Sequence, residues 1–454
     1  MTYNSELTTQ PIPRLIRRLA VPASIGFFFN TMFNVVDTYF GGLLSTQVLA
    51  ALSLSLPVFF IIIAMGTGLS TGTTALIANA LGAGKDDEAR LYAAQGITFG
   101  VITAVIITGV GCYTAPFLFK TLGATEGYLV DSVLYIDTIF VGSVFFMLAY
   151  MLNAILNAVG DTRSFRNFLI AGFFLNIGLD PWFMFGGCGM PPLGITGIAL
   201  ATVIIQLLGS IYLGFKVHKT GLIAGKQLHD IFPKAPPFRE IAYQGFPASL
   251  NMITVGIGFF VITYFISKFG KESVAAYGIG IRIEQIILIP IIGLNIATLT
   301  LVAHNNGAGH FDRITETLNK SLRYGGIISA AGTLAVIAGA PYLMAFFTDD
   351  GSVIAIGTTY LRIDALVFYA YFILFLHIAA LQGIKKPMFA VWIGIARQLV
   401  LPVAIFHVFV NIFRWELLGI WWGFFLITWG AALFTLVYAR RIITRTRPDR
   451  AASP

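Results

Sequence analysis

Twelve apolar stretches divide this sequence, and charged residues gather in the short segments between them. A helix needs about 20 apolar residues to cross the roughly 30 Å of hydrocarbon in a bilayer. The pattern therefore predicts an all-α integral membrane protein with twelve transmembrane helices. The expected spans are residues 15–42, 49–80, 92–112, 129–158, 165–186, 193–215, 241–267, 274–304, 322–345, 354–382, 388–411 and 418–439.

Small residues and prolines of the first half of the chain recur in the second half at one constant spacing. The repeated pairs are Pro22 with Pro247, Ala50 with Ala275, Gly68 with Gly293, Gly82 with Gly307, and Ala115 with Ala340. Each copy holds six spans, so both copies enter the membrane in the same sense, as in a parallel repeat about a pseudo-twofold axis along the membrane normal. We expect an N-terminal lobe at 1–215, a cytoplasmic linker at 216–240, a C-terminal lobe at 241–440 and a basic cytoplasmic tail at 441–454.

Composition and charge support this membrane assignment. The chain is 57% hydrophobic and 11% charged, whereas soluble domains devote about a quarter of their residues to charge. Of the 29 Lys and Arg residues, four fall outside when the N-terminus is inside, namely Lys120, Lys268, Lys271 and Arg414. Three more lie within spans. The positive-inside rule therefore predicts that both termini lie in the cytoplasm. We expect the protein in the inner (cytoplasmic) membrane of the cell.

The net charge of +8 is explained by this topology and by attraction to anionic lipid headgroups. Basic residues are not clustered with aromatic ones, so nucleic acid is not expected as a partner. The first span is too long for a removable signal peptide. Cys112 and Cys188 both fall near the predicted outer face, and we expect them to be unpaired.

Two acids lie inside apolar runs of the first copy. Asp37 and Asp180 correspond to Ile262 and Ile405 in the second copy, so buried charge is expected mainly in the first lobe. Asp37 lies five residues before Gly42, and Asp180 lies at a similar depth in its span, roughly 8 to 9 Å below the outer surface. An intramembrane carboxylate without a basic neighbour in its own lobe suggests a functional site.

Several motifs now identify a resemblance. PxPRLIRRLAVPASIG leads to FNVVDTYFGG, and LGAGKDDEAR, LNAILNAVGDTR and NIGLDPWFMFG follow at 81–90, 152–163 and 176–186. Over nearly its whole length the chain resembles the multidrug and toxic compound extrusion (MATE) transporters. An acid in the first span with Asn and Asp four apart in the fifth resembles the DNA-damage-inducible F branch. Span 241–267 lacks the acid typical of the norfloxacin-type branch.

The resemblance implies export of cationic amphipathic small molecules in exchange for H⁺ or Na⁺, without an enzymatic reaction or a cofactor. It places a proton or cation site at Asp37 and Asp180 together with Asn176, Asn153 and Thr202. Their depths allow these groups to meet in one lobe. Thr196 is an alternative to Thr202, and Asn153 could instead bond only between helices.

Burial and mutual repulsion of the two acids would favour protonation of at least one, which favours H⁺ as the coupling ion. Na⁺ at Asp37, Asn176 and Asp180 is the alternative, since Na⁺ prefers oxygen ligands. We expect protonation from outside to bend the first span at Pro22 and to expel the substrate. Further residues that could face the cavity are Tyr135, Asp137, Gln206 and Met32.

Two other functions stay open at this stage. A lipid or saccharide flippase of the same superfamily would need a basic cavity, for which only the arginines of the second lobe are available. A membrane enzyme could use Asp86-Asp87-Glu88, but no second acidic motif accompanies it. We expect Arg282, Glu284, Arg362, Asp364 and Arg397 to pair among themselves across helices, and the protein to be a monomer.

Overall fold

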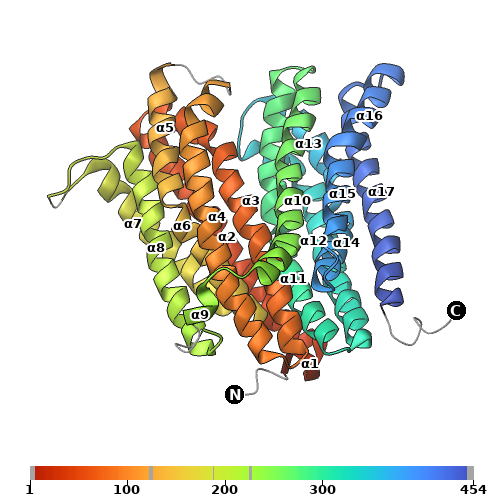
Figure 1. The fold of residues 1–454 in the computed structure, drawn as a ribbon. Helices are drawn as coiled ribbons and strands as arrows, with labels where there is room; N and C mark the ends of the chain where they lie inside the picture. Colours follow the sequence, from red (N-terminus) through yellow and green to blue (C-terminus); the bar gives the residue numbers. More distant parts are fainter. Residues whose placement is uncertain (1–5, 122–125, 188, 224–227, 447–454) are drawn as a thin grey trace. The chain divides into compact units, whose positions relative to one another are not determined.

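A computed structural model describes residues 6–121, 126–187, 189–223 and 228–446, which are almost entirely helical (Figure 1). Outside the helices, this part of the chain contains one isolated β-bridge, between Gly187 and Met190. The helices are α1 (Glu6–Thr9), α2 (Ile12–Leu44), α3 (Thr46–Gly82), α4 (Asp86–Thr121), α5 (Glu126–Val141), α6 (Ser143–Ala158), α7 (Arg163–Phe185), α8 (Ile195–Thr220), α9 (Leu228–Ile231), α10 (Ala235–Ser267), α11 (Lys271–Gly307), α12 (Phe311–Ala345), α13 (Gly351–Ala365), α14 (Phe368–Gly383), α15 (Met388–Ile395), the π-helical turn η1 (Ala396–Val400), α16 (Leu401–His407), the π-helical turn η2 (Val408–Ile412) and α17 (Glu416–Arg445).

The all-α membrane fold predicted from hydropathy is confirmed. Within the described ranges, ten helices are long and apolar enough to cross a membrane, counting Met388–Ile412 as one. Two bent pairs bring the number to as many as twelve: α5 with α6 bends by 45°, and α13 with α14 by 49°. Each predicted span lies along one of these helices or bent pairs. A bend does not change how many consecutive residues are apolar, so hydropathy detects a bent span as well as a straight one.

The two bends are related by the sequence repeat. They lie at Gly142 and at Val367, which have the same spacing in the chain as Pro22 and Pro247. The Thr108 hydroxyl donates a hydrogen bond to the Phe140 carbonyl, and the equivalent Thr333 hydroxyl donates to the Ala365 carbonyl at 2.6 Å. A bend opens the helical hydrogen-bond ladder, so each threonine satisfies a carbonyl beside the bend.

The helices form two compact units. Among the described residues, the first unit is Ile25–Ser249, and the second unit combines residues 6–24 with residues 250–446. The chain therefore changes unit inside α2 and inside α10, at positions that correspond to each other in the repeat. The predicted lobe limits at 215 and 240 fall within α8 and α10, because α8 continues to Thr220 and α10 begins at Ala235.

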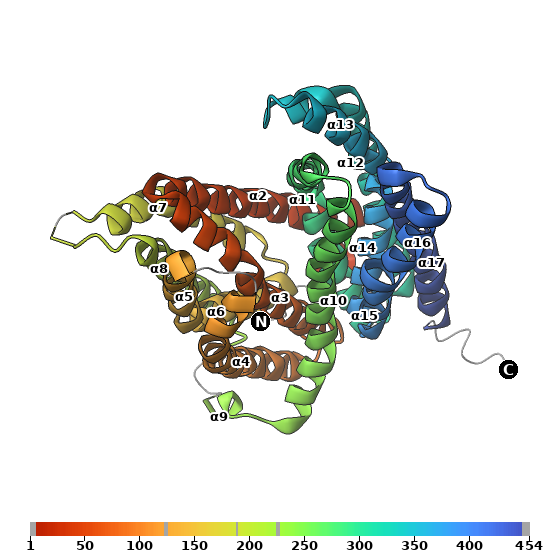
Figure 2. The same cartoon turned by 90° about the horizontal axis from the view of Figure 1, so that it is seen from above.

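In the first unit, the entry to α10 is held by α3 and α4. Gly68 of α3 lies against Ser249, so closely that a methyl group on it would overlap the serine's backbone and side chain. The fully buried Gln95 of α4 donates from its side-chain amide to the carbonyls of Asp230 and Phe232, the latter at 2.7 Å. Figure 2 shows α9 beside α4. The segment after α8 is thus bound to this unit.

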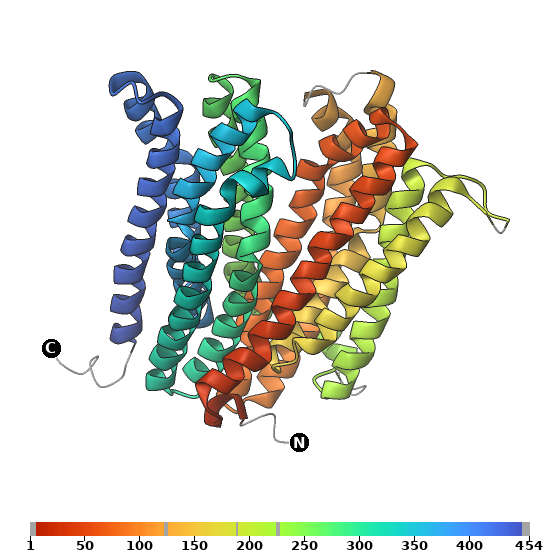
Figure 3. The same ribbon diagram turned by 180° about the vertical axis from the view of Figure 1, so that it is seen from behind.

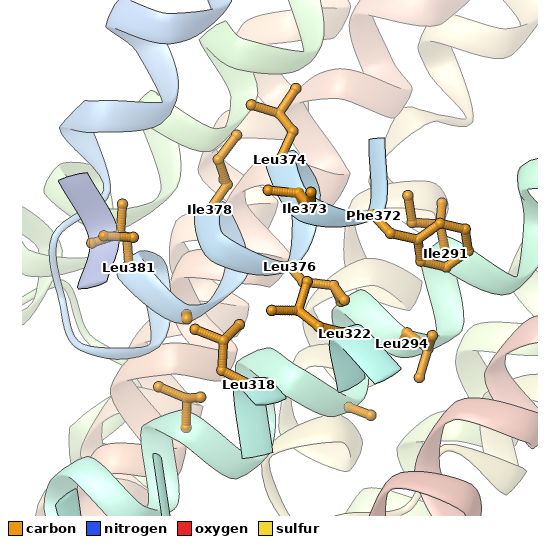
Figure 4. Packing of buried hydrophobic residues seen from close by; sticks show 14 of the residues in the cluster. Ile291, Leu294, Leu318, Leu322, Phe372, Ile373, Leu374, Leu376, Ile378 and Leu381 are labelled. Atoms are coloured by element: carbon orange, nitrogen blue, oxygen red, sulfur yellow. The ribbon is translucent and has the colours of Figure 1, made fainter. Parts of the chain in front are cut away.

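The second unit holds the start of the chain in the equivalent way. Gly293 of α11 lies against Ser24, which is the pair related to Gly68 and Ser249 by the repeat. Arg313 of α12 donates to the Gln10 carbonyl at 2.7 Å. Figure 3 shows the length of α2, whose first turns join the apolar core of this unit. Figure 4 shows that core where α11, α12 and α14 meet.

These contacts predict which glycines are needed for stability. Gly68→Ala and Gly293→Ala should each destabilise the protein by about 1 to 3 kcal/mol, because the added methyl group has no space. Thermal unfolding in detergent, read as the midpoint temperature, measures the effect. Gly109→Ala in α4 is the control, since a methyl group there meets nothing within 4 Å. Equal midpoints for all three variants would contradict the packing described.

Candidate functional site

Asp37 and Asn176 join two helices of the first unit. The Asn176 side-chain amide on α7 donates a hydrogen bond of 2.8 Å to Asp37 Oδ1 on α2. Asn176 is fully buried, and Asp37 is half-buried. Asp180 lies one turn further along α7 and is also fully buried. The structure therefore brings the predicted acids and Asn176 to one place.

The carboxyl group of Asp180 lacks a partner. Neither of its oxygens has a hydrogen-bond partner among the described residues, and the same holds for Asn176 Oδ1. Asp180 is close enough to Asp37 for the two carboxyl groups to interact electrostatically. Tyr135 on α5 is close enough to interact with both acids. Two carboxylates this close repel each other strongly where water is scarce. No ion pair to either acid occurs in the described ranges.

The sequence of α7 also affects the helical hydrogen bonds beside the acid. Pro181 follows Asp180 inside the helix and has no backbone N–H. The carbonyl of Ile177, four residues earlier, therefore receives no helical hydrogen bond from this position. The proline thus withholds the usual helical donor from a backbone oxygen about one turn from the acid.

Asn153 and Thr202 are both buried, on α6 and α8. Asn153 Oδ1 has no hydrogen-bond partner within the described part of the chain. The Thr202 hydroxyl donates to the Ile198 carbonyl of its own helix at 3.1 Å. Neither side chain makes a hydrogen bond to Asp37 or Asp180, so their membership of the site stays a prediction.

The other predicted residues make no contact with the acid pair that the structure records. Asp137 on α5 lies against Cys112 of α4 rather than against the acid pair. Gln206 and Met32 are half-buried. Pro22 is buried within α2, in the part of that helix that belongs to the second unit.

Only one of the two cysteines, which we expect to be unpaired, lies in the described part of the chain. Cys112 is a free, half-buried thiol. Cys188 lies outside the described residues, so the expectation about the pair is untested.

The expectation that buried charge is confined mainly to the first lobe is wrong. In the second unit Asp364 is 1% exposed, and neither of its carboxyl oxygens has a hydrogen-bond partner in the described ranges. It lies within electrostatic reach of Glu284, which accepts a hydrogen bond of 3.1 Å from the Tyr360 hydroxyl. The comparison with Ile262 and Ile405 missed these acids because they occupy other spans of the second copy.

The expected pairing of charges in this unit is also incorrect in part. Arg282 and Arg362 are exposed, and Arg362 donates to the Ile337 carbonyl at 3.4 Å instead of to an acid. Residues two apart on a helix face different directions, which separates each of them from the neighbouring acid. Arg397, in the π-helical turn η1, is buried, lies 5.7 Å from the centre of the Tyr371 ring and is within electrostatic reach of Glu284.

The first-unit site is suited to taking up a positive charge. Buried polar atoms nearly always have hydrogen-bond partners, and a group of acceptors without donors calls for a proton or a cation. Here the carboxyl oxygens of Asp180 and the Asn176 carbonyl are such acceptors, next to Asp37.

Comparison with known proteins decides the family. The MatE family model matches residues 22–182 and again 247–406, so its two matches begin at Pro22 and Pro247, the first pair of the repeat. The chain belongs to the MATE transporter family. The family consists of transporters, so the chain is a membrane transporter and not an enzyme.

Relatives and solved structures resemble this MATE protein along almost its full length. The probable multidrug resistance protein NorM of Thermotoga maritima is 29% identical over 93% of this chain and 91% of its own. The FAD transporter of Shewanella oneidensis is 26% identical over 88% of each chain. A crystal structure of a MATE protein in a bent conformation has a TM-score of 0.92 and 25% identity, covering 98% of this chain and 99% of its own.

For this MATE protein, the unpartnered carboxyl of Asp180 predicts an unusual effect on stability. Asp180→Asn should leave the thermal midpoint in detergent unchanged or raise it, because the amide removes repulsion with Asp37 and breaks no hydrogen bond. Asn176→Leu should lower the midpoint, since it removes the donor to Asp37. A fall for Asp180→Asn as large as that for Asn176→Leu would contradict the geometry.

Proposed function

We propose that this MATE protein is a secondary active exporter of cationic amphipathic small molecules, driven by entry of H⁺ at Asp37 and Asp180. The main support for this proposal is that the buried acceptor oxygens at the acid pair receive no hydrogen bond from a donor. One proton shared by two neighbouring carboxyl groups removes their repulsion. An organic cation in the transport path is favoured while the site is negative and disfavoured once it is protonated.

The position of Asp37 supports a link between protonation and shape. Asp37 and Pro22 lie on the same helix, α2, and Asp37 accepts the hydrogen bond of Asn176 from α7. Protonation weakens Asp37 as an acceptor, because an amide donates more strongly to a charged carboxylate. In the proposed cycle α2 then loosens from α7 and bends at Pro22, where the proline interrupts the helical hydrogen bonds. That change switches access from one side of the membrane to the other.

Na⁺ is the alternative coupling ion, and the same oxygens favour it as a second candidate. Asp37, Asp180 and the Asn176 carbonyl would supply hard oxygen ligands. The two versions differ in the gradient that drives export and share the same residues.

An anionic substrate has less support. One relative is named as an FAD transporter, and FAD is an anion. A flippase for anionic lipids or saccharides is the other alternative of this kind. Either would need free basic groups at the cavity. The buried Arg397 is already engaged with Tyr371 and Glu284.

We further propose that the protein lies in the inner membrane as a monomer with both termini in the cytoplasm. The distribution of Lys and Arg supports this orientation. Membership of the DNA-damage-inducible F branch is supported by Asp37, Asn176 and Asp180 together with an acid-free seventh span.

Transport into vesicles tests the proposal. In liposomes holding purified protein, a pH gradient alone should drive movement of a fluorescent organic cation. Asp37→Asn and Asp180→Asn should each lower the initial rate at least about tenfold, as expected for functional intramembrane acids. Asp131→Asn is the matched control, because it makes the same chemical change on α5.

The outcomes separate the alternatives. Transport driven only by a Na⁺ gradient and lost in the same two variants would assign Na⁺ to the site. Full transport by both variants would overturn the role of the acids, and transport of FAD without any organic cation would overturn the substrate class.

Pro22 has its own prediction. Pro22→Ala should restore the missing helical hydrogen bond, oppose bending of α2 and lower the transport rate severalfold, while binding of the same cation to detergent-purified protein changes little. Pro57→Ala is the control for removing a proline from a neighbouring long helix, α3. Normal transport by Pro22→Ala would show that the cycle does not need a bend at this residue.

A further inference from the structure

A groove lies between α7 and α8 in the first unit, and its lining includes no residue of the proposed coupling site. It has a volume of about 360 Å³ and is mostly apolar. Its lining includes Asn167, Ala171 and Leu175 from α7, and Ile205, Leu208 and Tyr212 from α8. Gly209 allows the helices to approach here, since a methyl group on it would overlap the Phe168 ring.

The surroundings of the groove indicate that it faces lipid. Phe174, Ile211 and Phe215 flank the lining residues on the same two spans, and each is more than half exposed. The groove extends from Asn167 to Leu175, which is roughly 12 Å along the helix. That length is close to half of the roughly 30 Å hydrocarbon core, so the groove fits the acyl region of one leaflet.

Two basic side chains are held at one end of the groove by its own lining. Arg166 donates twice to Asn167 Oδ1, at 3.1 and 2.7 Å. Lys216 lies 5.4 Å from the centre of the Tyr212 ring. Asp161, the acid before α7, is already occupied, because it accepts hydrogen bonds from the Arg163 and Ser164 backbones and the Ser164 hydroxyl. This end is therefore positively charged.

We propose that the groove binds an anionic phospholipid of the leaflet at the Arg163 end of α7, with an acyl chain in the groove and the phosphate at Arg166 and Lys216. The charge pattern predicts that this leaflet is the cytoplasmic one. A zwitterionic lipid would fill the groove equally but would gain less from two cations. The inference does not depend on the substrate or coupling ion proposed above.

Lipid binding to the full-length protein in detergent tests the proposal. Native mass spectrometry would be used to titrate the protein with phosphatidylglycerol and with phosphatidylcholine of the same acyl chains. Basic residues near the surface favour anionic lipid, so we expect phosphatidylglycerol to bind about tenfold more tightly. Arg166→Gln/Lys216→Gln should remove the preference. Lys219→Gln should keep it, because Lys219 packs on Phe215, which does not line the groove.

A second pair of variants tests the groove itself without changing charge. Ala171→Trp should fill it and lower phosphatidylglycerol binding about tenfold, whereas Ile211→Trp, on an exposed position beside the groove, should not. Equal affinity for both lipids in the unmodified protein would overturn the proposal. So would unchanged binding by Ala171→Trp, or displacement of the lipid by an organic cation or by a second copy of the protein.

Discussion

The hydrogen bond from Asn176 to Asp37 links the chemistry of the candidate site to the packing of its helices. It ties α2 to α7 while leaving the Asn176 carbonyl and the neighbouring Asp180 without donors. A buried group of acceptors is costly unless it gains a proton or a cation. In the proposed cycle the site takes up positive charge, and a change in that charge would act on the contact between α2 and α7.

The sequence repeat divides α2, which carries Asp37, between the two compact units. Each compact unit contains the entry to the first helix of the other repeat, because the chain changes unit after Ser24 and again after Ser249. Glycines at equivalent positions, Gly68 and Gly293, receive those two serines. α2 thus carries Asp37 in one unit and Pro22 in the other, so the proposed bend at the proline would act on the same helix that holds the acid.

Hydropathy and the repeat predict most of the fold, because the length of an apolar stretch and its copy are visible in the sequence. The bends at Gly142 and Val367 are not, since a bend does not change how apolar a segment is. Asp37 and Asp180 could be found in the sequence because they are acids inside apolar runs. Their similar predicted depth in the membrane indicated that they belong to one site. From the sequence we expect Asp364 to pair with Arg362 or Arg397. That expectation is wrong because neither arginine donates a hydrogen bond to Asp364.

The most direct test of the central claim is proton release on substrate binding. A saturating organic cation would be added to purified protein in weakly buffered detergent near neutral pH, and the change in pH recorded. Linkage predicts release of about one proton per protein, because cation and proton favour opposite states of the acid pair, and none from Asp37→Asn/Asp180→Asn. Cation binding without proton release, or binding that appears only when Na⁺ is removed, would contradict the claim.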